Sequence, residues 1–263
     1  MHLGVGSEES GEGEGGGGNG GGQPRMSVYD LFLDPTLPGE NAMVEVRPNL
    51  CLIPAETDLA AVETELANEP DRRTRLGTVL QGVISRAAAN GKPFDAVLLD
   101  CPPSLGLLTI NGLCAAREVF IPMQAHFLAL QGVSKLLETV TLIGKSANPR
   151  LAVTGVILCM HDANTTHTKE VVADLDEFFE QSRTQQVAWK AARVYRPAVR
   201  RNIKLAECPS FGKTIFDYDP ACAGAQDYLE LAKRIVGEWD KVVERMSGAT
   251  VSVVAKAPAP AVA

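Results

Sequence analysis

The sequence lacks the features that mark three large classes of protein: long apolar runs, a basic leader and paired cysteines. No window of the 263 residues approaches eighteen uninterrupted apolar positions, so no transmembrane helix is expected. The first residues contain Glu and Gly where a secretory signal needs a basic start and an apolar core. The six cysteines are scattered, with no C-x-x-C and no His at metal-ligand spacing. We therefore expect reduced thiols in a cytoplasmic protein that makes no membrane contact.

Composition indicates one globular domain between two ends that cannot pack. The chain is 45% hydrophobic and 22% charged, which suits a folded domain of ordinary size. Residues 1–25 are rich in Gly, Glu and Ser, so we expect a flexible segment there. Residues 247–263 end in an Ala/Pro sequence with nothing to contribute to a core. The predicted domain therefore spans residues 26–246.

Charge is distributed unevenly. The formal net charge is −7, which argues against a uniformly basic nucleic-acid binder. Residues 181–206 nevertheless contain no acid and seven cations, and we call these cations the basic stripe. Its members are Arg183, Lys190, Arg193, Arg196, Arg200, Arg201 and Lys204. The stripe is either a phosphate-binding surface or an ordinary solvated face.

Apolar runs alternate with helical periodicity, as in an α/β fold. Each run of Val, Leu and Ile predicts a buried strand, and each amphipathic stretch predicts a helix that covers it. Right-handed βαβ units of this kind form a parallel sheet with helices on both faces. The expected strands are residues 49–54, 95–100, 118–124, 151–160 and 193–199; the expected helices are 71–90, 107–116, 127–145, 166–179 and 220–246, with a further helix capped by Thr57.

The central predicted strand, residues 95–100, ends in a carboxylate. Ala96 to Leu99 are apolar, Asp100 follows, and two prolines at 102 and 103 prevent any continuation of strand or helix. The carboxyl ends of parallel strands form the edge where open α/β sheets bind ligands. Asp100 can therefore hold a nucleotide's Mg²⁺ through water, or simply cap the following turn. The residues alone leave both readings open.

The longer string DCPPSLGLLTINGL, residues 100–113, closely resembles the Walker B segment of the ParA/Soj family of partition ATPases. The resemblance covers about residues 26–237 and implies a P-loop NTPase fold of the deviant-Walker, SIMIBI type. It also implies binding of ATP and Mg²⁺, with Asp100 on the metal and Gln124 near the γ-phosphate. The family forms a nucleotide-dependent homodimer that coats DNA without sequence preference and acts with a ParB-type centromere-binding protein. A nucleoid-associated cytoplasmic protein is therefore expected.

A second match covers residues 194–220, where the family has a strand, a Pro-Arg-Asn-like turn and a helix ending in Ser-Phe/His-Gly-Lys. By this resemblance Arg201 and Asn202 contact the adenine, and an Asn amide suits the donor and acceptor atoms of that base. Arg200, which replaces the family's usual Pro, and Lys204 are the expected DNA contacts. About ten residues near 184–193 are inserted relative to the family pattern. A second family DNA position, an Arg, is occupied here by Asn164.

The sequence contains no G-x-x-x-x-G-K-[ST] phosphate loop. Gly144-Lys145-Ser146 and Gly212-Lys213-Thr214 have Thr139 and Glu207 where the leading Gly belongs. We therefore expect an α/β domain truncated at its N-terminus relative to the family, with no catalytic residue identified and hydrolysis abolished.

Two alternatives bear on the function. The first is a non-enzymatic DNA- or partner-binding regulator derived from the same fold. The second is a MinD-like membrane-cycling ATPase, which needs a basic amphipathic C-terminal helix; the predicted last helix instead mixes acids with its cations. His126, His161 and His167 lack a carboxylate or Cys at useful spacing, so we expect them on surfaces or in loops.

Overall fold

A three-stranded parallel sheet is the centre of the computed structural model, which describes residues 26–163 and 165–250. Its strands are β3 (Glu118–Met123), β4 (Ala152–Leu158) and β5 (Arg193–Tyr195), in the order β3-β4-β5. Both pairings are parallel, and one irregularity separates Val119 from Phe120 in the β3 ladder. The predicted flexible segment 1–25 and Asn164 lie outside the described residues. So do residues 251–263 of the predicted tail.

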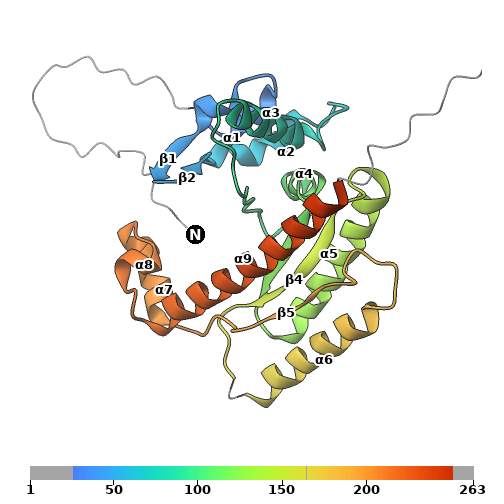
Figure 1. Ribbon diagram of the computed structural model, residues 1–263, viewed down its shortest axis with the longest axis vertical. Helices are drawn as coiled ribbons and strands as arrows, with labels where there is room; N and C mark the ends of the chain where they lie inside the picture. Colours follow the sequence, from blue (N-terminus) through green and yellow to red (C-terminus); the bar gives the residue numbers. More distant parts are fainter. Residues whose placement is uncertain (1–25, 164, 251–263) are drawn as a thin grey trace, which may run out of the picture.

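Helices cover both faces of this sheet, which confirms the predicted α/β architecture (Figure 1). On one face, Val156 and Leu158 pack with buried side chains of the helices before and after their strand. On the other face, Tyr195 packs against Leu231 of the long last helix. The covering helices are α4 (Leu107–Ala115), α5 (Phe127–Ser146), α6 (Thr166–Ser182) and α9 (Ala223–Thr250). Two short helices, α7 (Ile203–Glu207) and α8 (Ile215–Tyr218), flank the 3₁₀ helix η3 (Cys208–Phe211).

The N-terminal third folds around its own small apolar clusters, separate from the core of the sheet. It comprises α1 (Val28–Leu33), η1 (Gly39–Ala42), β1 (Val44–Arg47), β2 (Leu50–Leu52), η2 (Thr57–Ala61), α2 (Val62–Glu65) and α3 (Arg75–Ala89). The expected strand at 49–54 exists, but it pairs antiparallel with β1 and does not join the parallel sheet. The expected cap at Thr57 is wrong, because a 3₁₀ turn starts there and its N-cap, Glu56, makes no capping bond.

The predicted central strand at 95–100 is not formed, and this corrects the sequence prediction. These residues are in coil, and Leu98 is 90% exposed. A strand exists only when a neighbour accepts and donates its ladder hydrogen bonds. Within the described residues, β3 pairs with β4 alone, and β1 and β2 pair with each other. The apolar side chains of residues 96–99 favour burial, but no strand in the described part of the chain pairs with this segment, so no strand forms there.

The residues inserted near 184–193 close one end of the core. Ala188 accepts a hydrogen bond from the Val153 amide at 3.0 Å, at the beginning of β4. The Trp189 indole N–H donates to Ser182 Oγ at 3.1 Å, and Trp189 packs against the core of the sheet. The insertion therefore has a structural role, because it covers the amino ends of β4 and β5. In the described part of the chain, no helix is both long and apolar enough to cross a membrane.

Candidate functional site

The carboxyl ends of β3 and β4 bring Gln124 beside Met160. Met123 and Leu158 are register partners at the ends of the two strands, and the Cys159 amide donates to the Met123 carbonyl at 2.8 Å. Beyond this point, the Gln124 side-chain amide lies 3.6 Å from Met160 Sδ. Gln124 thus lies at the carboxyl edge of the parallel sheet, as the end of its predicted strand indicates, and its contact with a γ-phosphate stays a prediction.

The turn after β5 joins the same edge. The Val199 amide donates to the Leu158 carbonyl at 2.8 Å, and the His161 amide donates back to Val199 at 3.0 Å. The Arg201 amide then donates to the His161 carbonyl at 3.3 Å. These bonds extend β4 pairing past the strand itself, so the Pro-Arg-Asn-like turn lies against residues 158–161, which include the Met160 that neighbours Gln124.

Two local signals distinguish this edge from an ordinary loop. Met160 has φ +47°, a left-handed conformation that costs a non-glycine residue energy and recurs at functional sites. His161 Nδ1 is buried without a hydrogen-bond partner in the described structure. A buried polar atom without a partner is rare in folded proteins, and a bound ligand or water would supply the partner that His161 Nδ1 lacks. The expectation that His161 is an ordinary loop histidine is therefore incomplete. Sequence offered no signal, because the burial of Nδ1 comes from chain segments brought together by folding.

One side-chain atom of Asn202 has a structural role, as the cap of α7. Its side-chain oxygen accepts from the Lys204 amide at 2.8 Å and caps α7. An Asn cap uses the oxygen alone, so the two N–H donors of the amide stay available to a ligand. Arg201 beside it is exposed, with no side-chain ion pair in the described structure. A planar base with acceptor atoms is chemically compatible with this pair of residues.

Arg200 is held by a carboxylate of α9. Its Nη2 donates to Asp227 Oδ1 at 2.7 Å, its Nε donates to Oδ2 at 2.9 Å, and its backbone amide donates to Oδ2 at 3.0 Å. The Asp227 side chain is 6% exposed, and the hydrogen bonds from Arg200 lower its pKa. This fork geometry is the strong form of an ion pair. It fixes the turn to α9 and offsets the charge that Arg200 presents to an anion.

Lys204 is also paired. Its ammonium donates to Glu207 Oε2 at 2.9 Å and lies 5.7 Å from the centre of the Tyr218 ring. The hydrogen bond to Glu207 raises the lysine pKa. Lys204 therefore stays a cation at neutral pH, with one acidic neighbour.

Most members of the basic stripe form ion pairs with carboxylates that lie outside residues 181–206, and these pairs could not be read from the sequence. No acid lies within residues 181–206, yet the fold supplies acids from α6, α7 and α9. The paired members are Arg183 with Glu180, Arg193 with Glu238, Arg196 with Asp176, Arg200 with Asp227, and Lys204 with Glu207. Of the seven cations, Lys190 and Arg201 have no ion pair within the described structure.

Asp100 is exposed in the coil that precedes α4, and no described contact links it to the edge that holds Gln124. The described residues contain no group of three or more His, Cys, Asp or Glu side chains able to hold a metal. The role of Asp100 on Mg²⁺ stays a prediction.

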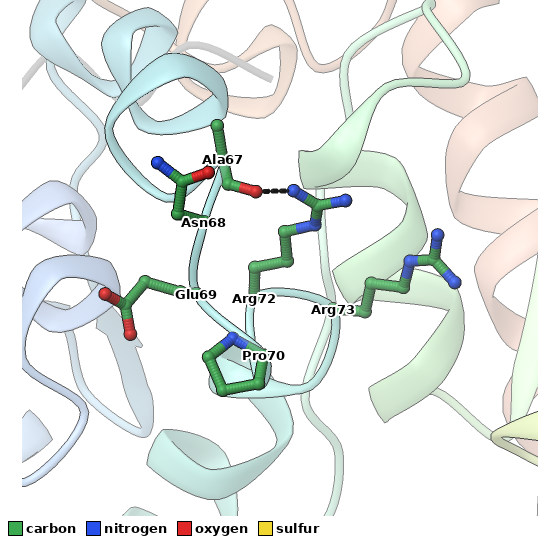
Figure 2. A pocket seen from close by; sticks show the side chains of 6 residues that line it. All are labelled: Ala67, Asn68, Glu69, Pro70, Arg72 and Arg73. Atoms are coloured by element: carbon green, nitrogen blue, oxygen red, sulfur yellow. Dashed lines mark hydrogen bonds between the residues drawn. The ribbon is translucent and has the colours of Figure 1, made fainter.

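Two adjoining hollows lie away from this edge, on the turn between α2 and α3. The larger, of about 320 Å³, is lined by the residues labelled in Figure 2, where the Arg72 guanidinium donates to the Ala67 carbonyl. The smaller, of about 210 Å³, shares Arg72 and Arg73 and reaches the first residues of α4. Glu63 already occupies that helix end, since its Oε1 accepts from the Leu107 amide at 2.6 Å. Neither hollow contains a predicted site residue.

The parallel sheet with helices on both faces defines the class of α/β proteins to which this chain belongs. Among solved structures, cobyrinic acid a,c-diamide synthase from Mycobacterium smegmatis, crystallised with ADP and magnesium, superposes with a TM-score of 0.62. It is 30% identical, over 82% of this chain and 73% of that one. The fold is that of the P-loop ATPases, and the predicted fold class is confirmed.

Sequence comparison defines the family more closely. Residues 16–153 match the family model described as an AAA domain. The chromosome partitioning protein ParA of Caulobacter vibrioides is 37% identical over 214 residues, which cover 81% of this chain and 74% of the relative. The sporulation initiation inhibitor protein Soj of Bacillus subtilis is 38% identical over 208 residues, covering 79% and 75%. This chain belongs to the ParA/Soj family, as its DCPPSLGLLTINGL segment predicted.

Proposed function

We propose that this chain acts in the partition of chromosomes or plasmids as a nucleotide-responsive protein that binds DNA without sequence preference. The family relationship supports the partition role. The observation that supports the proposal is that two backbone segments adjoin near Gln124 at the carboxyl edge of a parallel sheet: the segment of Met160 and His161, and the turn of Arg201 and Asn202. In this proposal a ParB-type protein is the partner, and two copies of the chain assemble around the nucleotide.

The residues present fit the base of ATP better than its phosphates. His161 Nδ1 is buried without a hydrogen-bond partner in the described structure, and the capping bond of Asn202 uses only its side-chain oxygen, which leaves the amide donors for a base. A phosphate cradle needs successive backbone amides at the start of a helix. Gly144 lies inside α5, and the Gly212 turn closes η3 through its hydrogen bond to Pro209. Bound ATP would bring its Mg²⁺ and the polar oxygens that this ion requires.

The adenine contact is tested by asking whether the chain prefers ATP to GTP. Asn202→Ser keeps an oxygen that caps α7 but removes the amide donors. We expect ATP affinity to fall about tenfold while GTP affinity is unchanged, which is the cost of one lost recognition bond. Fluorescent ATP and GTP analogues in an equilibrium titration measure both. Asn90→Ser, at the exposed end of α3, is the control. Equal losses for both nucleotides would show that Asn202 acts through the fold.

The magnesium contact is tested through Asp100. We expect Asp100→Asn to weaken the dependence of ATP binding on Mg²⁺, because a neutral amide binds the hydrated ion less strongly. Asp95→Asn is a matched control, since Asp95 is an exposed carboxylate in the same coil. A Mg²⁺ titration that is identical for the wild type and Asp100→Asn would remove Asp100 from the site.

Hydrolysis is the part of the family's activity that we do not assign to these 263 residues. Each missing preorganised donor costs catalysis roughly 3 kcal/mol, and a phosphate loop supplies several. The second candidate function is therefore a non-enzymatic DNA- or partner-binding regulator, favoured by the absence of G-x-x-x-x-G-K-[ST] from the sequence. The two functions differ in one measurement. A nucleotide switch requires duplex DNA affinity to change when ATP is added, and the regulator requires that it does not.

A further inference from the structure

Three exposed apolar side chains gather on the short helices that precede α9. Ile203 is 67% exposed, Phe211 is 62% exposed and Phe216 is 41% exposed. They belong to α7, η3 and α8, and Figure 1 shows α7 and α8 beside the first turns of α9. We call this region, residues 203–218, the α7–α8 surface. Exposed apolar groups gathered in this way are typical of binding surfaces.

The central feature of this surface is a stacked aromatic pair. The rings of Phe211 and Tyr218 have centroids 5.2 Å apart and planes inclined by 25°. Tyr218 is fixed in turn, because its hydroxyl donates to Glu207 at 3.0 Å. Tyr218 covers one face of the Phe211 ring. Because Phe211 is still 62% exposed, the other face of its ring is open to solvent. An open π-face on a fixed base is suited to accept another flat ring.

The backbone beneath the ring is well defined. Gly212 adopts φ +60° and donates to the Pro209 carbonyl at 3.0 Å, while Lys213 donates to the Cys208 carbonyl at 3.2 Å. Below them, Cys208 and Ile215 are buried in a small apolar cluster. Little ordering is therefore required when a ligand binds, which lowers the entropic cost of association.

Lys204 lies 5.7 Å from the centre of the Tyr218 ring that stacks on Phe211, and two of the nearby acids are engaged in ion pairs. Glu207 pairs with Lys204, and Asp217 pairs with Arg47. Lys213, next but one to Phe211, has no ion pair in the described part of the chain. A stacked aromatic pair with an ammonium group beside it suits the bases and phosphates of a nucleic acid strand.

We propose that the α7–α8 surface binds single-stranded nucleic acid, with one unpaired base stacked on the open face of Phe211 and Lys204 and Lys213 near the adjoining phosphates. Stacking on an aromatic side chain is tolerant of sequence, since every base has a π-face. Paired bases within a duplex have both faces occupied, so this contact selects unpaired strands. The inference requires neither ATP nor a duplex, and it therefore stands or fails separately from the proposed function.

The test compares variants of one exposed ring. Fluorescence anisotropy with a labelled fifteen-nucleotide oligo-dT strand, at a fixed low salt concentration, should show Phe211→Ala binding roughly five- to 150-fold more weakly than the wild type. Phe211→Leu should lose nearly as much, since it keeps apolar volume without a ring, and Phe211→Trp should bind at least as tightly as the wild type. Phe178→Ala is the matched control. It removes a 40% exposed phenylalanine that also contacts a second ring, on the distant helix α6.

Several results would overturn the proposal. The first is an oligo-dT affinity unchanged in Phe211→Ala, with the fold verified by circular dichroism. The second is a wild-type affinity weaker than about 100 μM at low salt, the range of non-specific electrostatic contact. The third is sedimentation showing self-association that Phe211→Ala abolishes while oligo-dT binding persists, which would assign the surface to a second copy of the chain. Loss of the ATP response with duplex DNA would not bear on this test.

Discussion

Asn111 provides the sharpest test of how this fold is held together. The side chain is fully buried, and its Nδ2 donates to the carbonyls of Arg72 at 2.7 Å and Leu107 at 3.0 Å. Its Oδ1 accepts from the Leu76 amide at 3.2 Å. Leu76 is the second residue of α3, whose own N-cap, Thr74, makes no side-chain capping bond. Asn111 of α4 therefore caps α3 from a separate helix.

Replacing Asn111 by Ala removes the cap and leaves two distant backbone groups without their partner. A lost N-cap costs about 1 kcal/mol, and each buried backbone group left unpaired costs about 1–3 kcal/mol. Partial access of water reduces the sum, so we expect the free energy of unfolding to fall by about 3 kcal/mol. For a chain of this size, that corresponds to a decrease in Tm of roughly 6–12 °C.

Urea denaturation followed by circular dichroism measures this change directly. Asn90→Ala, at the exposed C-terminal end of α3, is the control and should change the free energy by less than about 0.5 kcal/mol. If Asn111→Ala cost less than about 1 kcal/mol, the capping argument would be refuted. The burial of Asn111 within the DCPPSLGLLTINGL segment would then need an explanation other than capping of α3.

Three further predictions follow from single side chains. Arg200 lowers the pKa of Asp227, so the pair stabilises the fold above pH 4 and loses its effect as pH falls through the lowered value. The stability difference between the wild type and Asp227→Asn should accordingly shrink between urea titrations at pH 7 and pH 3. Trp189→Ala removes the hydrogen bond to Ser182 and the indole that packs on the core, so the free energy of unfolding should fall by about 2–3 kcal/mol in the same assay. Trp189→Phe keeps an aromatic ring there and should recover half or more of that loss. Leu98→Asp should leave the free energy of unfolding within about 0.5 kcal/mol of the wild type, because the side chain is 90% exposed; a loss above 2 kcal/mol would show that residues 95–100 form a buried strand.

Local pattern predicted the elements whose partners lie close in the sequence. The apolar runs that became β3 and β4, and the helical spacing that became α4, α5 and α6, are each sufficient to define their element. The same reasoning failed at residues 95–100 because a strand depends on a neighbour that no apolar run can supply. The start of α3 was predicted four residues early, since Asp71 suggests a helix start while the actual cap comes from Asn111.

The candidate site was predictable in position but not in its charges. Gln124 could be placed at the sheet edge because it ends a predicted strand, whereas Asn202 was placed by the family resemblance of residues 194–220. The ion pair of Arg200 with Asp227 could not be predicted, since the two residues are 27 positions apart in the sequence. His161 carried no sequence signal either. Its unpartnered Nδ1 results from the pairing of its segment with residues 199–201.

The paired state of the basic stripe bears on how this protein can bind a duplex. DNA affinity comes from phosphates neutralised by cations, and each neutralised phosphate adds nearly one unit to the slope of log affinity against log salt. A cation already paired with a carboxylate releases less free energy when it meets a phosphate, because the first contact must be broken or shared. With Lys190 and Arg201 as the two stripe members that have no ion pair in the described residues, one copy engages few phosphates. Binding by two linked copies raises the affinity without any new contact in either copy. The charge arrangement on one chain therefore adds support to the proposal that two copies of the chain assemble.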